Sequence, residues 1–107
     1  MFEIVRYQRE DGAEPYTEWF RRLRDAMAKT AIGKRLRRIE TGNFGDCKPV
    51  GEGVSELRID VGPGYRIYFG LRGTALVVLL CGGDKSSQGR DIVTAKAYWT
   101  DWKRRQP

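Results

Sequence analysis

Two arginines and a tyrosine, Arg58, Arg66 and Tyr68, occur in two short segments in which polar and apolar residues alternate. The Gly-Pro-Gly stretch at 62–64 predicts a turn between them, which would place Arg66 opposite Asp60 and Tyr68 opposite Arg58 on one face of a β-hairpin. A guanidinium binds phosphate oxygens at two points, so paired arginines suit the charge that develops when RNA is cleaved by its own 2′-hydroxyl. A phenol could orient a base or that hydroxyl. The pattern predicts a phosphate-directed site.

The same residues also permit a structural interpretation, and the sequence leaves both open. Asp60 could neutralise Arg66 across the strands, and Arg58 could lie over the ring of Tyr68 as a cation–π pair. A site is favoured because these side chains share a face and because Lys85 follows the next predicted strand. Lysine and tyrosine both have reference pKa values of about 10 and are protonated at neutral pH. Either would therefore serve only as a proton donor unless its pKa is shifted.

The segment 82–87, Gly-Gly-Asp-Lys-Ser-Ser, superficially resembles a phosphate loop because it joins a predicted strand to a predicted helix. The G-x-x-x-x-G-K spacing of nucleotide-binding loops is absent, which favours an ordinary tight turn. Backbone N–H groups at a helix start, beside the ammonium group of Lys85, could still hold a single phosphate. Lys85 is therefore a candidate for phosphate binding or proton donation.

The composition excludes several kinds of catalytic and metal-binding site, because the 107 residues include two Cys and no His. Histidine-ligated zinc, Ser-His-Asp triads, Cys-His nucleophiles and RNA cleavage by a histidine pair are all excluded. Cys47 and Cys81 lack the C-x-x-C spacing of metal and redox sites, so we expect buried or idle thiols, no metal and no cofactor.

The 20 Lys plus Arg exceed the 14 Asp plus Glu, which indicates an anionic partner without saying whether it is RNA, DNA, the ribosome or an acidic protein. Four cations cluster in one predicted helix and form either a solvated face or a contact with a polyanion. They are Lys34, Arg35, Arg37 and Arg38. No apolar run approaches the roughly 18 residues that cross a bilayer, and no signal peptide is recognisable. We expect one cytoplasmic domain over residues 1–107.

Hydrophobic spacing predicts a strand and two helices in the first half of the chain. Residues 1–7 suit a short strand that a polar turn closes. Pro15 suits a first helical position, and apolar residues follow at helical spacing on the inward face. They are Tyr16, Trp19, Phe20, Leu23 and Met27. A second helix is predicted over 30–41, with Gly42 as its stop.

The second half favours three strands and a final helix. The hairpin register pairs Leu57 with Phe69, which gives one wholly apolar face, and the apolar run 75–81 suits a central strand buried on both sides. Trp99 and Trp102 lie at helical spacing and suit core packing better than base stacking, while 103–107 should fray. The order β-α-α-β-β-β-α predicts an α+β fold with helices against a small, mainly antiparallel sheet.

Four segments carry the motifs of a known group of proteins: Glu-Leu-Arg-Ile at 56–59, Gly-Pro-Gly-Tyr-Arg-Ile-Tyr-Phe at 62–69, Leu-Leu-Cys-Gly-Gly-Asp-Lys-Ser-Ser-Gln at 79–88 and Asp-Ile at 91–92. With them, the chain resembles the RelE/ParE superfamily of toxins, and within it the HigB-like, phage Gp49-related addiction module killer proteins. The resemblance spans essentially the whole chain and implies a RelE-like fold.

The resemblance implies the toxin of a type II toxin–antitoxin system: a metal-independent endoribonuclease, or mRNA interferase, that cuts mRNA on ribosomes and inhibits translation. A small helix-turn-helix antitoxin would neutralise it. By position, Arg66 matches the Arg of the Gly-Tyr-Arg segment, Lys85 the basic residue after the last core strand, and Arg58 the basic groups before the hairpin. Related toxins often carry Tyr or His as an acid–base group where this chain has Asp91 and Ile92, so Tyr68 or Lys85 would have to substitute.

Two other functions fit the same sequence. One is a ParE-like, non-enzymatic inhibitor of DNA gyrase, and the other is a non-toxic, phage-derived nucleic-acid-binding module. Under the ribonuclease hypothesis, we expect Arg58, Arg66, Tyr68 and Lys85 to form the catalytic site. The basic second helix would then contact ribosomal RNA.

Overall fold

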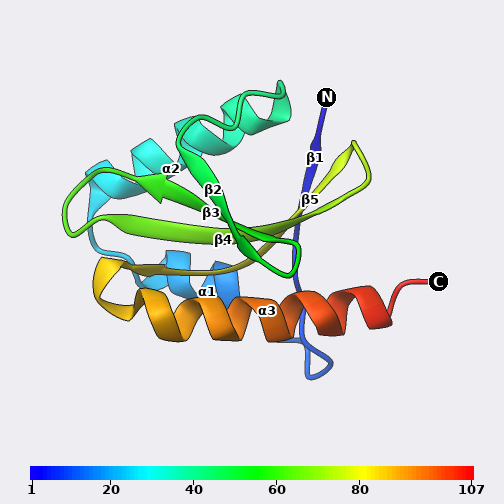
Figure 1. The fold of residues 1–107 in the computed structure, drawn as a ribbon. Helices are drawn as coiled ribbons and strands as arrows, with labels where there is room; N and C mark the ends of the chain where they lie inside the picture. Colours follow the sequence, from blue (N-terminus) through cyan, green and yellow to red (C-terminus); the bar gives the residue numbers. More distant parts are fainter.

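In the computed structural model, which describes residues 1–107, a five-stranded sheet lies between helices on its two faces (Figure 1). The elements are β1 Glu3–Arg6, α1 Pro15–Arg22, α2 Ala26–Glu40, β2 Cys47–Gly51, β3 Val54–Ile59, β4 Tyr65–Arg72, β5 Leu76–Asp84, the short 3₁₀ helix η1 Lys85–Ser87, and α3 Gln88–Arg104. The predicted α+β class and the predicted succession of elements are confirmed, and β2 is an additional strand.

The strands are arranged in the order β1-β5-β4-β3-β2. Only β1 runs parallel to its neighbour, β5, and the other three pairs are antiparallel. Residues 77–81 of β5 are buried, as expected for an apolar run between two neighbouring strands. The hydrophobic effect therefore fixes β5 in the interior of the sheet.

The two faces of the sheet bury separate hydrophobic clusters. Tyr16 of α1 and Ile32 of α2 pack on one face, whereas Ala95 and Trp99 of α3 pack on the other. Figure 1 shows α2 and α3 on opposite sides of the sheet. Trp99 is buried and stacks on Trp102 with ring centroids 5.2 Å apart, so the predicted core role of these tryptophans is confirmed.

The helix boundaries differ from the prediction at one junction. α1 ends at Arg22, and Met27, predicted to face inward, is 75% exposed in the first turn of α2. Asp25 causes the break, because its carboxylate accepts a hydrogen bond of 3.0 Å from the backbone N–H of Ala28 and so caps a new helix. α2 therefore begins four residues before the predicted start.

The hairpin register also differs, by two residues. Arg58 lies opposite Arg66, and Glu56 lies opposite Tyr68. The connection is longer than Gly-Pro-Gly because Val61 N–H donates to the Ile59 carbonyl at 2.9 Å, which ends β3 before Asp60. A shift of two residues leaves every side chain on its predicted face, so the cationic face survives but Asp60 is not the partner of Arg66.

The unpredicted strand β2 forms the edge of the sheet beside β3. Pro49 lies within it and is exposed, and the register shifts between Pro49 and Gly51. Proline and glycine are poor strand formers, which is why the sequence pattern does not reveal β2. Its pairing places Lys48 opposite Glu56.

The C-terminal end of α3 is held more firmly than predicted, since the helix includes Lys103 and Arg104. The hydroxyl of Tyr7 donates to Asp101 at 2.6 Å, and Arg105 pairs with the same carboxylate at 2.8 Å. The hydrogen bond from Tyr7, with those from Arg105 and Arg104, lowers the pKa of Asp101 to about 2. No helix combines the length and apolar character needed to cross a membrane.

Gly82 and Gly83, predicted to form a turn, lie instead within β5, and the turn is η1. Neither position has room for a side chain. A Cβ on Gly82 would collide with the indole of Trp19, and a Cβ on Gly83 would collide with the carboxylate of Asp91.

We predict that Gly82→Ala lowers the free energy of unfolding by about 1–3 kcal/mol, because Trp19 must move. Gly89→Ala is the matched control: nothing lies within 4 Å of its Cβ, so it should be neutral or stabilising by up to about 1 kcal/mol. Urea unfolding monitored by tryptophan fluorescence measures both. Equal stability of the two variants would contradict the packing at Gly82.

Candidate functional site

The charged group that organises the predicted site is Glu56, which the sequence did not single out. It is the single buried charged residue, with no exposed surface. Its carboxylate accepts hydrogen bonds from Gln88 Nε2 at 2.7 Å and from the Tyr68 hydroxyl at 3.2 Å. Gln88 is the first residue of α3, so this carboxylate joins β3, β4 and the start of α3.

Arg58 and Arg66 both form ion pairs with the other oxygen of this carboxylate, Glu56 Oε1. Arg58 Nε lies 3.2 Å and Arg66 Nε 3.6 Å from Glu56 Oε1. Both guanidiniums thus approach through Nε. Arg58 donates through neither of its terminal nitrogens, and Arg66 uses only Nη1, in a long contact of 3.4 Å with the Tyr65 carbonyl. Both terminal nitrogens of Arg58 and Nη2 of Arg66 therefore have no hydrogen-bond partner in the protein and can donate to a phosphate.

The site carries more positive than negative charge. Two arginines directly opposite one another would repel, and Glu56 neutralises only one of the two charges. The side chain of Arg66 is only 12% exposed, and its buried Nε makes no hydrogen bond. A buried cation without full compensation is costly, so the site is suited to receive an anion.

Burial alone would raise the pKa of Glu56, but hydrogen bonds from Gln88, Arg58 and Tyr68 and the charge of Arg66 outweigh it and hold the pKa below its usual value. Glu56 is therefore ionised at neutral pH. A depressed carboxyl pKa stabilises the fold above the ordinary value of about 4.3, and that contribution is lost as the pH falls through the depressed pKa.

Tyr68 does not reach the surface, since its side chain is fully buried. Burial raises the pKa of its hydroxyl, and the nearby charge of Glu56 raises it further. The prediction that this phenol touches a base or a reacting hydroxyl is therefore wrong for this geometry. Tyr68 instead supports Glu56, because its O–H is donated to the carboxylate.

Lys85 lies at the rim of the site and is exposed. An ideal Cβ on Gly64 would be 3.6 Å from Arg66 Nη1 and 3.8 Å from Lys85 Cβ, so both side chains border the same backbone. The predicted phosphate cradle of backbone N–H groups is absent, because Asp84 accepts the hydrogen bond from Ser86 N–H at 2.8 Å. Lys85 thus contributes its ammonium group alone.

The four predicted nucleic-acid-binding cations of α2 lie on the opposite side of the sheet from Arg58 and Arg66. Lys34, Arg37 and Arg38 are exposed. Arg35 is half-buried and donates to the backbone carbonyls of Arg58, Phe44 and Asp46. Arg35 is consequently a backbone clamp that fixes β3 at Arg58, which corrects its predicted role.

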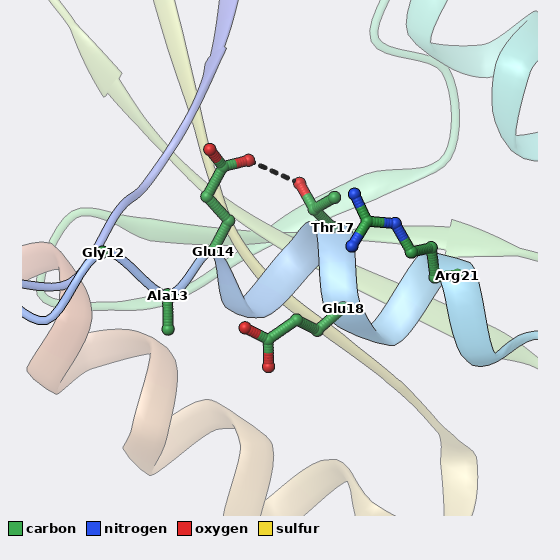
Figure 2. Close-up of a pocket in the computed structure, with 6 residues that line it drawn as sticks. All are labelled: Gly12, Ala13, Glu14, Thr17, Glu18 and Arg21. Carbon is green, nitrogen blue, oxygen red and sulfur yellow. Dashed lines mark hydrogen bonds between the residues drawn. The ribbon is translucent and has the colours of Figure 1, made fainter.

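Other features of the molecule fall outside this site. Figure 2 shows a hollow beside the start of α1, where Thr17 donates to Glu14 at 2.8 Å; none of the predicted site residues lines it. No three Cys, Asp or Glu side chains gather as metal ligands would. Cys47 and Cys81 are free, as predicted, and burial raises the pKa of Cys81 to about 12, so this thiol is inert at neutral pH.

Glu56 and Gln88 are the residues that sequence reasoning missed. In an alternating strand a glutamate is typical of a solvent-facing position, and Gln88 is separated from it by 32 residues. The signal was the neighbour pattern: Glu56 precedes Arg58 by two residues and so shares its face, together with Arg66 and Tyr68. The two arginines on this face need a counterion, and Glu56 is the acidic residue that shares the face with them.

Because Arg35 satisfies three carbonyls at once, we predict that Arg35→Gln lowers the free energy of unfolding by about 2 kcal/mol. Arg37→Gln, an exposed change of the same type on the same helix, should stay within about 0.5 kcal/mol of the unmodified protein. Chemical denaturation of both variants checks this. An Arg35→Gln protein as stable as Arg37→Gln would show that the clamp is dispensable.

Comparison with known proteins gives one informative relationship. No family model matches the chain. Over 81 residues it is 49% identical to an uncharacterized protein of Haemophilus influenzae, and this alignment covers 76% of the chain and 82% of the relative. Identity at this level over most of both proteins means a common fold and descent, and the chain belongs to the same family as this Haemophilus influenzae protein.

Proposed function

We propose that the protein is a RelE-like, HigB-like toxin that cleaves mRNA and is neutralised by a cognate antitoxin. The observation that carries the proposal is the pair of arginines, Arg58 and Arg66, which share one buried carboxylate while three of their four terminal nitrogens have no hydrogen-bond partner in the protein. One unit of positive charge is left uncompensated in a half-buried site. A phosphodiester supplies the missing anion.

In the proposed reaction, the 2′-oxygen of a ribose attacks the adjacent phosphorus, and the bond from phosphorus to the 5′-oxygen of the next nucleotide breaks. The products are a 2′,3′-cyclic phosphate and a free 5′-hydroxyl. Arg58 and Arg66 stabilise the added negative charge on the phosphate oxygens. Lys85, exposed at the rim, donates a proton to the departing 5′-oxygen, while water accepts the proton of the 2′-hydroxyl.

Glu56 and Tyr68 act in this proposal as positioning residues. The carboxylate of Glu56 binds each arginine through Nε and so leaves three of their four terminal nitrogens without a protein hydrogen bond, since only Arg66 Nη1 has a partner. Tyr68 and Gln88 fix the carboxylate in turn. Preorganised donors stabilise a transition state because they need no rearrangement when the charge develops.

The exposed cations of α2 support the proposal that the partner is as large as the ribosome. Lys34, Arg37 and Arg38 lie on the other side of the sheet from Arg66, so a short RNA in the site does not reach them. A ribosome-bound message with surrounding ribosomal RNA presents phosphates to both sides. The antitoxin, a small helix-turn-helix protein, would neutralise the toxin by covering Arg58 and Arg66.

Induction of the protein in cells should arrest growth and fragment mRNA, and Arg66→Ala should relieve both. We expect loss of one phosphate-binding guanidinium to lower the cleavage rate by about 10²-fold or more. Arg66→Lys keeps the charge but loses two-point binding, so it should be intermediate. Sequencing of RNA 5′ ends during induction measures cleavage, and thermal unfolding verifies that each variant is folded.

Arrest by folded Arg66→Ala, with intact mRNA and broken DNA, would overturn the ribonuclease proposal in favour of gyrase inhibition. Harmless induction of the unmodified protein would favour a nucleic-acid-binding module without toxicity.

Glu56→Gln should separate binding from catalysis. The substitution adds one unit of positive charge to the site, so the affinity for a non-cleavable RNA should be kept or improved. The arginines lose their shared counterion, and we expect the rate constant at saturating RNA to fall about tenfold or more. A merely structural role predicts instead that affinity and rate decline together in proportion to the unfolded fraction.

A further inference from the structure

We propose that Lys48 is a further RNA-binding residue and that the substrate lies across the strands, from β2 to the start of η1. The inference deepens the proposed function and rests on it. Its basis is a row of four cations that four neighbouring segments contribute: Lys48, Arg58, Arg66 and Lys85, referred to below as the cation track.

Strand pairing places Lys48 on the cation track. Its Cα partner across the β2–β3 pair is Glu56, so the two side chains project from the same face of the sheet. Arg58 is two residues along β3 from Glu56 and therefore also on this face. Arg58 pairs with Arg66, and Arg66 pairs with Gly83, two residues before Lys85. The track thus runs diagonally over the end of the sheet.

Lys48 is free to take a ligand. It is exposed, and it forms neither an ion pair nor a cation–π contact, although it lies opposite a buried carboxylate. Glu56 is directed instead toward β4 and α3, where Tyr68 and Gln88 bind it. The lysines of α3 differ, since Lys96 pairs with Glu52 at 3.3 Å and Lys103 lies over the ring of Trp99.

The length of the track suits a single strand of RNA. Three strand intervals of about 4.8 Å separate β2 from β5, so the cations extend over about 14 Å. This is several times the axial spacing of phosphates along one nucleic-acid strand, about 3.4 Å. The phosphate at the two arginines therefore has neighbours that Lys48 and Lys85 reach on either side. β2 supplies one end of an RNA path whose centre is Arg58 and Arg66.

The test is the salt dependence of binding of the full chain to a fluorescent, 2′-O-methyl single-stranded RNA of nine nucleotides, which cannot be cleaved. Each phosphate contact on a single strand adds about 0.7 to the slope of log affinity against log salt. Lys48→Gln should reduce the slope by about 0.7 and weaken binding several-fold at low salt, whereas Lys48→Arg should retain the slope. Lys103→Gln, at the opposite end of α3, is the control for net charge and should leave the slope unchanged.

A slope for Lys48→Gln equal to that of Lys103→Gln would overturn the role of Lys48 while leaving the ribonuclease proposal intact, provided that Arg66→Ala lowers the slope. If the unmodified protein binds the RNA with no salt dependence, both proposals fail together. Since Lys48 is exposed on an edge strand, the substitution leaves the core intact, and thermal unfolding of each variant confirms this.

Discussion

Ionisation of Glu56 inside the protein is the constraint on which the surrounding structure depends. An isolated carboxylate transferred from water to the interior is strongly destabilising, so each of its neighbours must be a donor or a cation. The chain meets this requirement with side chains from β3, β4 and the first residue of α3. The same four interactions fix where α3 starts over the sheet and how the two arginines are oriented. The four interactions with Glu56 therefore both stabilise the fold and organise the candidate site.

The sequence was informative where side-chain periodicity decides the structure. Alternation in 54–69 and the apolar run at 75–81 predicted the hairpin and the interior strand correctly, because burial of one or both faces imposes these patterns. The register could not be obtained in the same way. Registers that differ by two residues bury the same face, and only the hydrogen bonds of the 60–64 loop select between them.

The candidate site was predictable in its cations but not in their organisation. Arg58 and Arg66 were identified from spacing, yet the roles of Arg35 and Tyr68 depend on contacts with distant backbone and buried groups. A local pattern does not distinguish a solvated arginine on a helix from one that reaches three carbonyls. Lys48 was missed for a related reason: β2 contains Pro49 and is defined by its partner strand rather than by its own periodicity.

Pro49 has a consequence for assembly. An edge strand offers unpaired backbone donors and acceptors to which another chain can add, and proteins suppress this with proline, lysine and bulges. β2 combines all three, since Lys48 and Pro49 are exposed and the register shifts before Gly51. Continuous β-pairing with a second copy is blocked at this border, so self-association by strand addition does not conceal the cationic end of the sheet.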